Sequence, residues 1–441
     1  MEKASGSGRV VPAGILIPFI LVTLLFPLWG FANDITNPMV KAFSRILQMS
    51  NFQGSLVQFA FYGGYFAMAF PAALFIKRYS YKAGILVGLG LYATGALLFI
   101  PGSMMMVFWP FLVAYFILTC GLSFLETSAN PYILSMGSEE TATRRLNLAQ
   151  SFNPMGSLLG MFVAQQLILA RLNPATAADR AAMPADQLAA LTAQDLAVIR
   201  TPYLGIALVI AVVFVAIAVT RMPAYGEEDR SLDVRPTLRR LSRNSRYVEG
   251  VVAQFFYVGA QIMCWTFIIH YGTMELGLTE VQAQGYNMVA MLIFVTSRFI
   301  CTFLLKYVSP GGLLLALALA GGGLTLGAIF IPGMVGLYCL VGVSACMSLM
   351  FPTIYGIALK GVGEDAKLGA AGLIMAILGG SVMPPLQGAI IDLQTVSLGG
   401  VSFPAVRASF LLVVVCFAVI AHYGWRTARH RPTTSPHHQT A

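Results

Sequence analysis

Apolar residues along this 441-residue chain occur in long runs that short polar segments separate. Each run holds about twenty residues, the length that an α-helix needs to cross roughly 30 Å of hydrocarbon. The alternating ten-residue segments of a membrane β-barrel are absent from the pattern. The pattern therefore predicts twelve membrane-spanning helices, an even number that puts both termini on one side. Their approximate centres are Val22, Phe61, Tyr92, Leu118, Leu158, Ala211, Ala260, Ile293, Leu319, Gly342, Ala376 and Val414.

The composition agrees with a membrane protein. Hydrophobic residues make up 57% of the chain, charged residues make up 10%, and the mean hydropathy is +0.76. Soluble globular proteins have about a quarter charged and about half apolar residues. We therefore expect an all-α membrane protein that resides in the lipid bilayer.

Basic residues predict the orientation of the spans. Twenty of the 27 Lys and Arg lie in segments on the side of the two termini, and six lie on the opposite side. Loops rich in Lys and Arg face the cytoplasm, so both termini are expected there. The same bias accounts for the net charge of +9, and no nucleic-acid partner is expected. The first apolar run lacks a small-residue cleavage pattern, so it is expected to remain as the first span.

A long charged segment divides the spans into six and six. The loops that follow spans two and eight share a basic residue, a tyrosine, a serine and a glycine, and the ends of spans four and ten also match. Two six-helix halves in pseudo-two-fold relation are the layout of the major facilitator fold; chance similarity is the alternative. The expected division is an N-terminal half over 1–221, a cytoplasmic linker over 222–247, a C-terminal half over 248–425 and a cytoplasmic tail over 426–441. A second long segment, 171–200, is expected outside with a short surface helix.

One carboxylate lies deep inside a predicted span. Glu126, in FLETSANPY (124–132), sits near the middle of span four, and Asn130 follows one turn later on the same face. A charge at this depth costs about 2.5–3.5 kcal/mol on insertion scales, so it is rarely present without a role. A carboxyl group that is protonated facing one side and ionised facing the other carries protons. The alternative is a permanently protonated glutamate that bonds a neighbouring helix.

Amides and aromatic residues occur at helical spacing in several other spans. A single amide is more often interhelical glue, worth about 0.6 kcal/mol, but clusters in both halves predict a polar cavity between them. Amides that bond vicinal hydroxyls, beside aromatic ring faces, suit a sugar. The expected sugar-binding residues are Asn33, Asn37, Asn130, Gln150, Asn153, Tyr257, Gln261, Trp265 and Asn287.

Two other charged residues lie within predicted spans. Asp34, near the outer end of span one, is the second candidate for proton coupling. Arg298, within span eight, is always charged and needs water, a carboxylate or carbonyls around it. Two roles are possible for this arginine: a structural or gating contact with other protein groups, or a contact with the substrate.

Readings from other protein classes have little support. The stretch GVGED (361–365) partly matches the GxGD of intramembrane aspartyl proteases, but a glutamate follows the second glycine and the stretch lies in a loop. There is no HExxH and no serine elbow, so no enzyme activity is expected. A channel would need a filter or a ring of like residues. The six cysteines lie within or beside spans without a CxxC or Cys–His pattern, so neither a metal site nor a cofactor is expected.

The motifs also resemble a known family. The sequence is similar to the L-fucose:proton symporter family of the major facilitator superfamily from about Pro18 to Ile420. The resemblance implies a monomeric twelve-helix transporter of the bacterial inner membrane, which imports L-fucose or a related hexose with a proton. The motifs that carry it are FLETSANPY, RRLNLAQSFNPMGS (144–157), FYGGYF (61–66), RYSYKAGILVGLGLYATGALLF (78–99) and AQFFYVGAQIMCW (253–265).

The resemblance also assigns roles, with one departure. A glutamate in span four and an aspartate in span one are tied to transport in that family, and Glu126 matches the first. The second falls on Asn37, and Asp34 lies one turn earlier on roughly the same face. The family also includes glucose/galactose and amino-sugar importers, some of them with sodium, so a sodium- or proton-coupled glucose/galactose or N-acetylglucosamine importer is the alternative.

Overall fold

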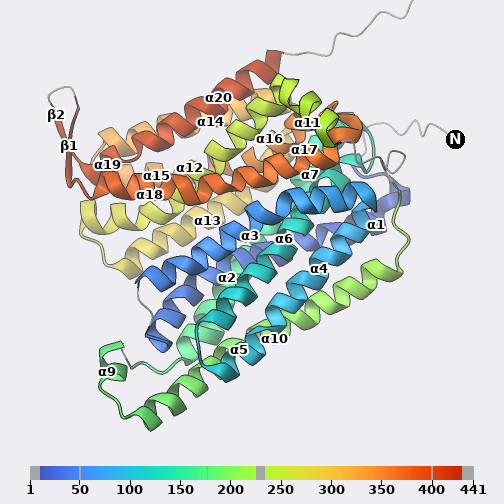
Figure 1. Cartoon of the computed structure of the whole chain (residues 1–441). Coiled ribbons are helices and arrows are strands. Elements are labelled where there is room, and N and C mark those ends of the chain that lie inside the picture. Colours follow the sequence, from blue (N-terminus) through green and yellow to red (C-terminus); the bar gives the residue numbers. More distant parts are fainter. Residues whose placement is uncertain (1–9, 49–50, 176, 225–233, 399–400, 430–441) are drawn as a thin grey trace, which may run out of the picture.

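The structure is a computed structural model that describes residues 10–48, 51–175, 177–224, 234–398 and 401–429. Long helices form two groups side by side, one coloured blue to green and the other yellow to red (Figure 1). Helix α1 and the end of α20 lie at one end of the bundle, which we call the terminal end. Helix α9 and the β1–β2 hairpin lie at the opposite end, which we call the hairpin end (Figure 1).

The first group of helices comes from the N-terminal part of the chain. Its elements are η1 (Ala13–Ile15), α1 (Leu16–Thr23), α2 (Leu25–Ile46), α3 (Asn51–Arg78), α4 (Tyr81–Leu97), α5 (Phe99–Met105), α6 (Trp109–Ser135), α7 (Glu139–Gln150), α8 (Asn153–Val163), the π-helical η2 (Ala164–Ile168), η3 (Leu169–Arg171), α9 (Ala177–Ala181) and α10 (Ala185–Val219).

The second group follows the linker helix α11 (Val234–Arg243). Its elements are α12 (Ser245–Leu276), α13 (Glu280–Leu304), α14 (Pro310–Phe330), α15 (Met334–Met347), α16 (Met350–Ala358), η4 (Gly363–Asp365), α17 (Ala366–Met375), η5 (Ala376–Leu378), α18 (Gly379–Ile391), β1 (Thr395–Leu398), β2 (Val401–Pro404), α19 (Ala405–Ala408) and α20 (Leu411–Arg429). The two strands form an antiparallel hairpin in which Thr395 pairs with Pro404.

The fifth predicted span is not a single continuous helix. Eleven helices among the described residues are long and apolar enough to cross a membrane, and they contain eleven of the twelve predicted centres. The remaining centre, Leu158, lies in α8, which residues 151–152 separate from α7. Pro154 explains the break, because it has no N–H for the carbonyl of Gln150 and fits the first turn of a new helix. Together α7, α8 and η2 occupy the place of the fifth span.

Each group of helices surrounds its own hydrophobic core, and the first core extends into the second group. Tyr92, Leu122 and Ile210 belong to the first core, which also includes Tyr355 of α16 and Leu373 of α17. Between the groups, α17 packs on α3 and α6, while α16 packs on α7. All these helices meet near the terminal end (Figure 1), so the halves are in contact there.

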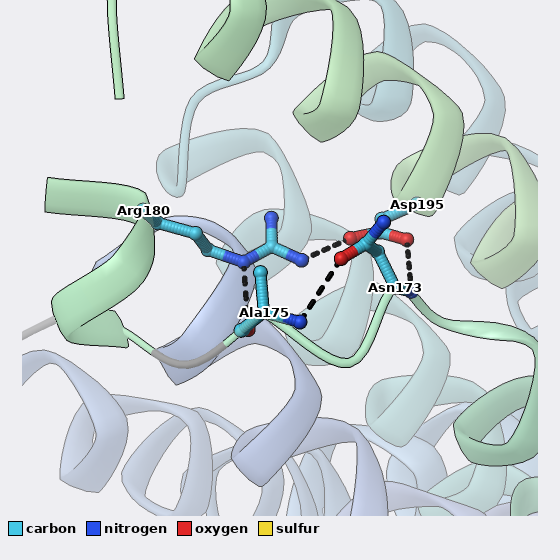
Figure 2. Close-up of polar contacts among 4 residues, drawn as sticks. All are labelled: Asn173, Ala175, Arg180 and Asp195. Atoms are coloured by element: carbon cyan, nitrogen blue, oxygen red, sulfur yellow. Dashed lines mark hydrogen bonds and ion pairs between the residues drawn. The ribbon is translucent and has the colours of Figure 1, made fainter. Parts of the chain in front are cut away.

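A buried ion pair organises the segment between spans five and six. Arg180 of α9 and Asp195 of α10 form a salt bridge, and both side chains are almost completely buried. The other oxygen of Asp195 accepts a hydrogen bond of 2.9 Å from the backbone N–H of Asn173, and the Arg180 Nε donates to the carbonyl of Ala175 (Figure 2). The short helix expected in 171–200 is α9, and α10 begins within the same segment.

Candidate functional site

Glu126 is buried between two helices of the N-terminal half. It lies in α6, and its side chain is 5% exposed. The hydroxyl of Tyr65 in α3 donates a hydrogen bond of 2.8 Å to Glu126 Oε1 and a longer one of 3.4 Å to Asn33 Oδ1 of α2. Among the described residues, no cation forms an ion pair with this carboxyl group. The arrangement leaves Glu126 with a neutral donor instead of a fixed countercharge.

A chain of amides leads from Glu126 to the broken fifth span. Asn130 lies one turn after Glu126, as predicted, and its Nδ2 donates to the Glu126 backbone carbonyl at 3.0 Å. Its Oδ1 accepts a hydrogen bond of 2.8 Å from Gln150 Nε2 at the end of α7. Both amide side chains are almost completely buried. Three groups expected from sequence therefore come together around α6 and α7.

Asn153 lies apart from this chain because the helix breaks before it. Its Nδ2 donates to the carbonyl of Phe26 at 3.0 Å, so this amide joins α8 to α2. The two helices approach closely at glycines: a Cβ placed on Gly30 would lie 2.2 Å from the carbonyl oxygen of Asn153. In this conformation, one side-chain hydrogen bond of Asn153 is thus used for helix packing.

Asp34 lies in the same half as Glu126, on α2. Asp34 is half-buried, and its carboxyl group lies beside the side chain of Ser157 in α8, whose hydroxyl donates to the backbone carbonyl of Gly30 at 3.4 Å. The neighbouring Asn33 is also half-buried. The side chain of Asn37, one turn further along, lies outside the described residues. The first and fifth spans thus bring Asp34 and Ser157 together.

The residues expected from the C-terminal half lie on α12 and α13. The Tyr257 hydroxyl is buried and donates to the carbonyl of Met347 at 3.2 Å. Trp265, half-buried, donates from Nε1 to Ser344 Oγ at 3.3 Å. Gln261 is half-buried, and Asn287 has a buried Oδ1 that receives no hydrogen bond from the described residues. Trp265, Gln261 and Asn287 therefore retain polar or aromatic surface for a ligand, whereas the Tyr257 hydroxyl is occupied.

Arg298 does not meet a carboxylate. Its guanidinium is 3% exposed and donates to two backbone carbonyls, those of Ser348 and Gln150, the second at 2.9 Å. Its Cζ lies 4.6 Å from the ring centroid of Phe294, within cation–π range. Since Gln150 belongs to the other half, this arginine joins the two halves.

A cavity of about 370 Å³ lies at the terminal end, between the halves. Its lining includes Pro131 of α6 and Gly356 of α16, together with charged side chains such as Glu139, Lys360 and Lys367. None of the residues expected to bind sugar lines it. Within the described parts of the chain, no three His, Cys, Asp or Glu side chains come together as a metal site.

Sequence reasoning missed two residues that lie beside the carboxylates. Tyr65, the donor to Glu126, lies in the stretch FYGGYF that was noted only for its family resemblance. The sequence could have indicated this role, because a buried tyrosine hydroxyl in a span needs a hydrogen-bond partner. Ser157, the neighbour of Asp34, is a small residue between Gly156 and Gly160 and carries no comparable signal.

The chain is similar to known proteins along nearly its whole length. A family model described as Major Facilitator Superfamily matches residues 22–384. The L-fucose-proton symporter of Haemophilus influenzae is 52% identical over 427 residues, which cover 95% of this chain and 98% of the relative. A glucose/galactose transporter of Brucella abortus is 32% identical over 410 residues, covering 91% and 92%. The crystal structure of FucP, a fucose:proton symporter of Escherichia coli, in the outward conformation has a TM-score of 0.86 at 36% identity, covering 96% of this chain and all of that chain.

Proposed function

Since the chain belongs to the L-fucose–proton symporter family of the major facilitator superfamily, we propose that it imports L-fucose with a proton by alternating access. It is a multi-pass membrane transporter and not an enzyme. The observation that carries the proposal is the buried Glu126 carboxyl group, which has a tyrosine donor and no ion-pair partner among the described residues. In such surroundings the protonated, neutral form of a carboxyl group is favoured. The ionised form is destabilised, because burial removes water and no countercharge replaces it.

In this proposal Glu126 is the proton-coupling residue. Protonation makes the Glu126 side chain neutral. The transporter that carries sugar and proton can then change conformation without keeping an unpaired charge in an apolar environment. Asp34 is the second proton-coupling candidate, because it also lies within a span and has the neutral hydroxyl of Ser157 beside it. Asp34 would then take the role that the family aspartate would have at Asn37.

The proposed sugar site lies between the halves. On the N-terminal side, the amides of α2, α6, α7 and α8 supply hydrogen bonds to hydroxyl groups, and on the C-terminal side Trp265 supplies an aromatic face. Part of this set is engaged with protein atoms in the present conformation, as for Gln150 and Asn153. The assigned residues are Asn33, Asn37, Asn130, Gln150, Asn153, Tyr257, Gln261, Trp265 and Asn287.

The contacts between the halves also support an assignment of sides. We propose that the terminal end is cytoplasmic, because basic residues concentrate in the segments on that side. Closure at the terminal end then corresponds to an outward-facing state, in agreement with the likeness to a solved structure in the outward conformation. We further propose a monomer in the bacterial inner membrane, with halves over 1–221 and 248–425 that the linker 222–247 joins.

Labelled-sugar uptake into proteoliposomes tests the function. L-Fucose, galactose, glucose and N-acetylglucosamine are compared under an inward proton gradient, and then under an inward sodium gradient alone. Accumulation of L-fucose with the proton gradient only is the expected result. Accumulation of another hexose, or accumulation with sodium only, would contradict the proposal and would favour the alternative that the 32% identical glucose/galactose transporter represents.

A further inference from the structure

Arg298 bridges two interrupted helices, one in each half of the molecule. Its Nη1 donates to the carbonyl of Gln150, the last residue of α7, and its Nε donates to the carbonyl of Ser348, between α15 and α16. Each of these carbonyls lies four residues before a proline, Pro154 in one case and Pro352 in the other. Because proline has no N–H, neither carbonyl has its usual donor within the helix. The arginine supplies both missing donors.

The same geometry explains how a cation is tolerated here without a carboxylate. Within the described parts of the chain, Arg298 has no ion pair. The carboxyl ends of α7 and α15 carry the negative ends of their helix dipoles, and both ends face the guanidinium. The ring of Phe294 adds a cation–π contact at 4.6 Å. Of these groups, the Gln150 carbonyl stabilises the charge only while α7 and α13 stay together.

Arg298 also connects the proposed proton and sugar groups. On one side, the Gln150 side chain donates to Asn130, which in turn donates to the carbonyl of Glu126. On the other side, Phe294 packs edge-to-face on Trp265, with ring centroids 5.0 Å apart. A change at Glu126 therefore reaches the guanidinium through three direct contacts, and a change at Trp265 reaches it through two.

We propose that Arg298 is the latch between the halves: by capping the proline-freed carbonyls of Gln150 and Ser348, it holds the terminal end closed until the transporter is loaded. The part of this inference that concerns loading rests on the proposed function, whereas the latch itself does not. Weaker bonds accompany it across the same interface. Asn147 Nδ2 donates to Thr353 Oγ1 at 3.1 Å, and the hydroxyls of Ser151 and Thr302 lie 3.4 Å apart.

The test measures how often the terminal end opens when no sugar or ion gradient is present. Thr143 is 7% exposed, and it faces Gly356 of the other half, so a cysteine in its place reports separation of the halves. Thr143→Cys protein in nanodiscs is labelled with a maleimide, and the rate of protein without the reporter is subtracted. Adding Arg298→Met is expected to raise the labelling rate about tenfold or more, equivalent to about 1.4 kcal/mol. Thr302→Val, the matched control, removes the weak contact with Ser151 and a hydrogen bond to the backbone carbonyl of Arg298 within α13, but it leaves the guanidinium and its two carbonyls in place. It is expected to change the rate less than about threefold.

Reactivity of the native Cys416, which is fully buried within the C-terminal core, reports folding in the same experiment. If Arg298→Met exposes Cys416, Arg298→Lys is measured instead, because one ammonium group keeps the charge but lacks the planar fork that reaches both carbonyls. Faster labelling at position 143 with Cys416 still protected supports the latch. An unchanged labelling rate at position 143 in a folded Arg298 variant overturns it. Since no sugar is added, neither result depends on which sugar the protein transports.

Discussion

The close contact between the first and fifth spans gives a sharp prediction for Gly156→Ala. A Cβ on Gly156 would lie 1.9 Å from the carbonyl oxygen of Pro27, a backbone atom that no rotamer change can move away. A Cβ on Gly160, one turn later, would lie 2.7 Å from the carbonyl oxygen of Phe31, and the two glycines form the GxxxG pattern of tightly packed membrane helices. Restoring an ordinary contact of 3.4 Å requires α8 and α2 to separate locally by about 1.5 Å.

The magnitude follows from what this separation disrupts. Overpacking of a close-packed interface costs about 1–3 kcal/mol. The hydrogen bond between Asn153 Nδ2 and the Phe26 carbonyl spans the same interface, and its loss adds about 1 kcal/mol. We therefore expect Gly156→Ala to lower the free energy of unfolding by about 2–4 kcal/mol.

The assay is a denaturant titration in detergent micelles, followed by tryptophan fluorescence, with Gly205→Ala as the control. Gly205 lies within the α-helix α10, and a Cβ placed there meets nothing within 4 Å. Alanine at this position is expected to leave stability unchanged or to raise it by up to about 1 kcal/mol, because alanine favours helix. If Gly156→Ala and Gly205→Ala differ by less than about 0.5 kcal/mol, the packing of α2 on α8 described here is wrong.

Two further predictions concern buried polar groups. Tyr65→Phe removes the donor to Glu126, and a hydrogen bond to a charged group is worth about 1.5–3 kcal/mol. Proton-driven sugar uptake should therefore fall about 10- to 100-fold, while sugar exchange, which needs only the protonated transporter, should fall less; equal losses in both assays would refute this. Asp195→Asn leaves Arg180 buried without its countercharge and should destabilise the protein by about 3–5 kcal/mol, whereas Arg180→Met combined with Asp195→Leu should be less harmful. Thermal unfolding measures both variants, and a double variant that is no more stable than Asp195→Asn would count against a buried charge effect.

Much of the fold followed from the hydrophobic pattern, because a span is defined by length and apolarity, which sequence shows directly. Eleven predicted centres lie in helices long enough to cross the membrane. The break in the fifth span was missed, because Gln150 and Asn153 lie three residues apart, a spacing that one continuous helix would also give. The signal was present in Asn153-Pro154, since a proline both releases a carbonyl behind it and favours the start of a helix.

The candidate site was predictable where residues share a helix and less so where helices meet. The relation of Asn130 to Glu126 follows from helical spacing, and the structure has that hydrogen bond. The contact of Gln150 with Asn130 depends on how α7 packs on α6, which spacing along one helix does not determine. For Arg298, the sequence indicated a need for carbonyls or a carboxylate, but the choice depends on two proline-freed carbonyls that lie far away in the chain.

Transport by Glu126→Gln protein in proteoliposomes tests the central claim most directly. Glutamine keeps the shape of the protonated side chain but cannot release a proton. Two rates are compared with those of the unsubstituted protein: accumulation of labelled L-fucose under an inward proton gradient, and exchange of labelled for unlabelled L-fucose without a gradient. The account predicts that exchange persists while accumulation is abolished. Accumulation of L-fucose against its gradient by Glu126→Gln protein would contradict the assignment of Glu126 as the proton-coupling residue.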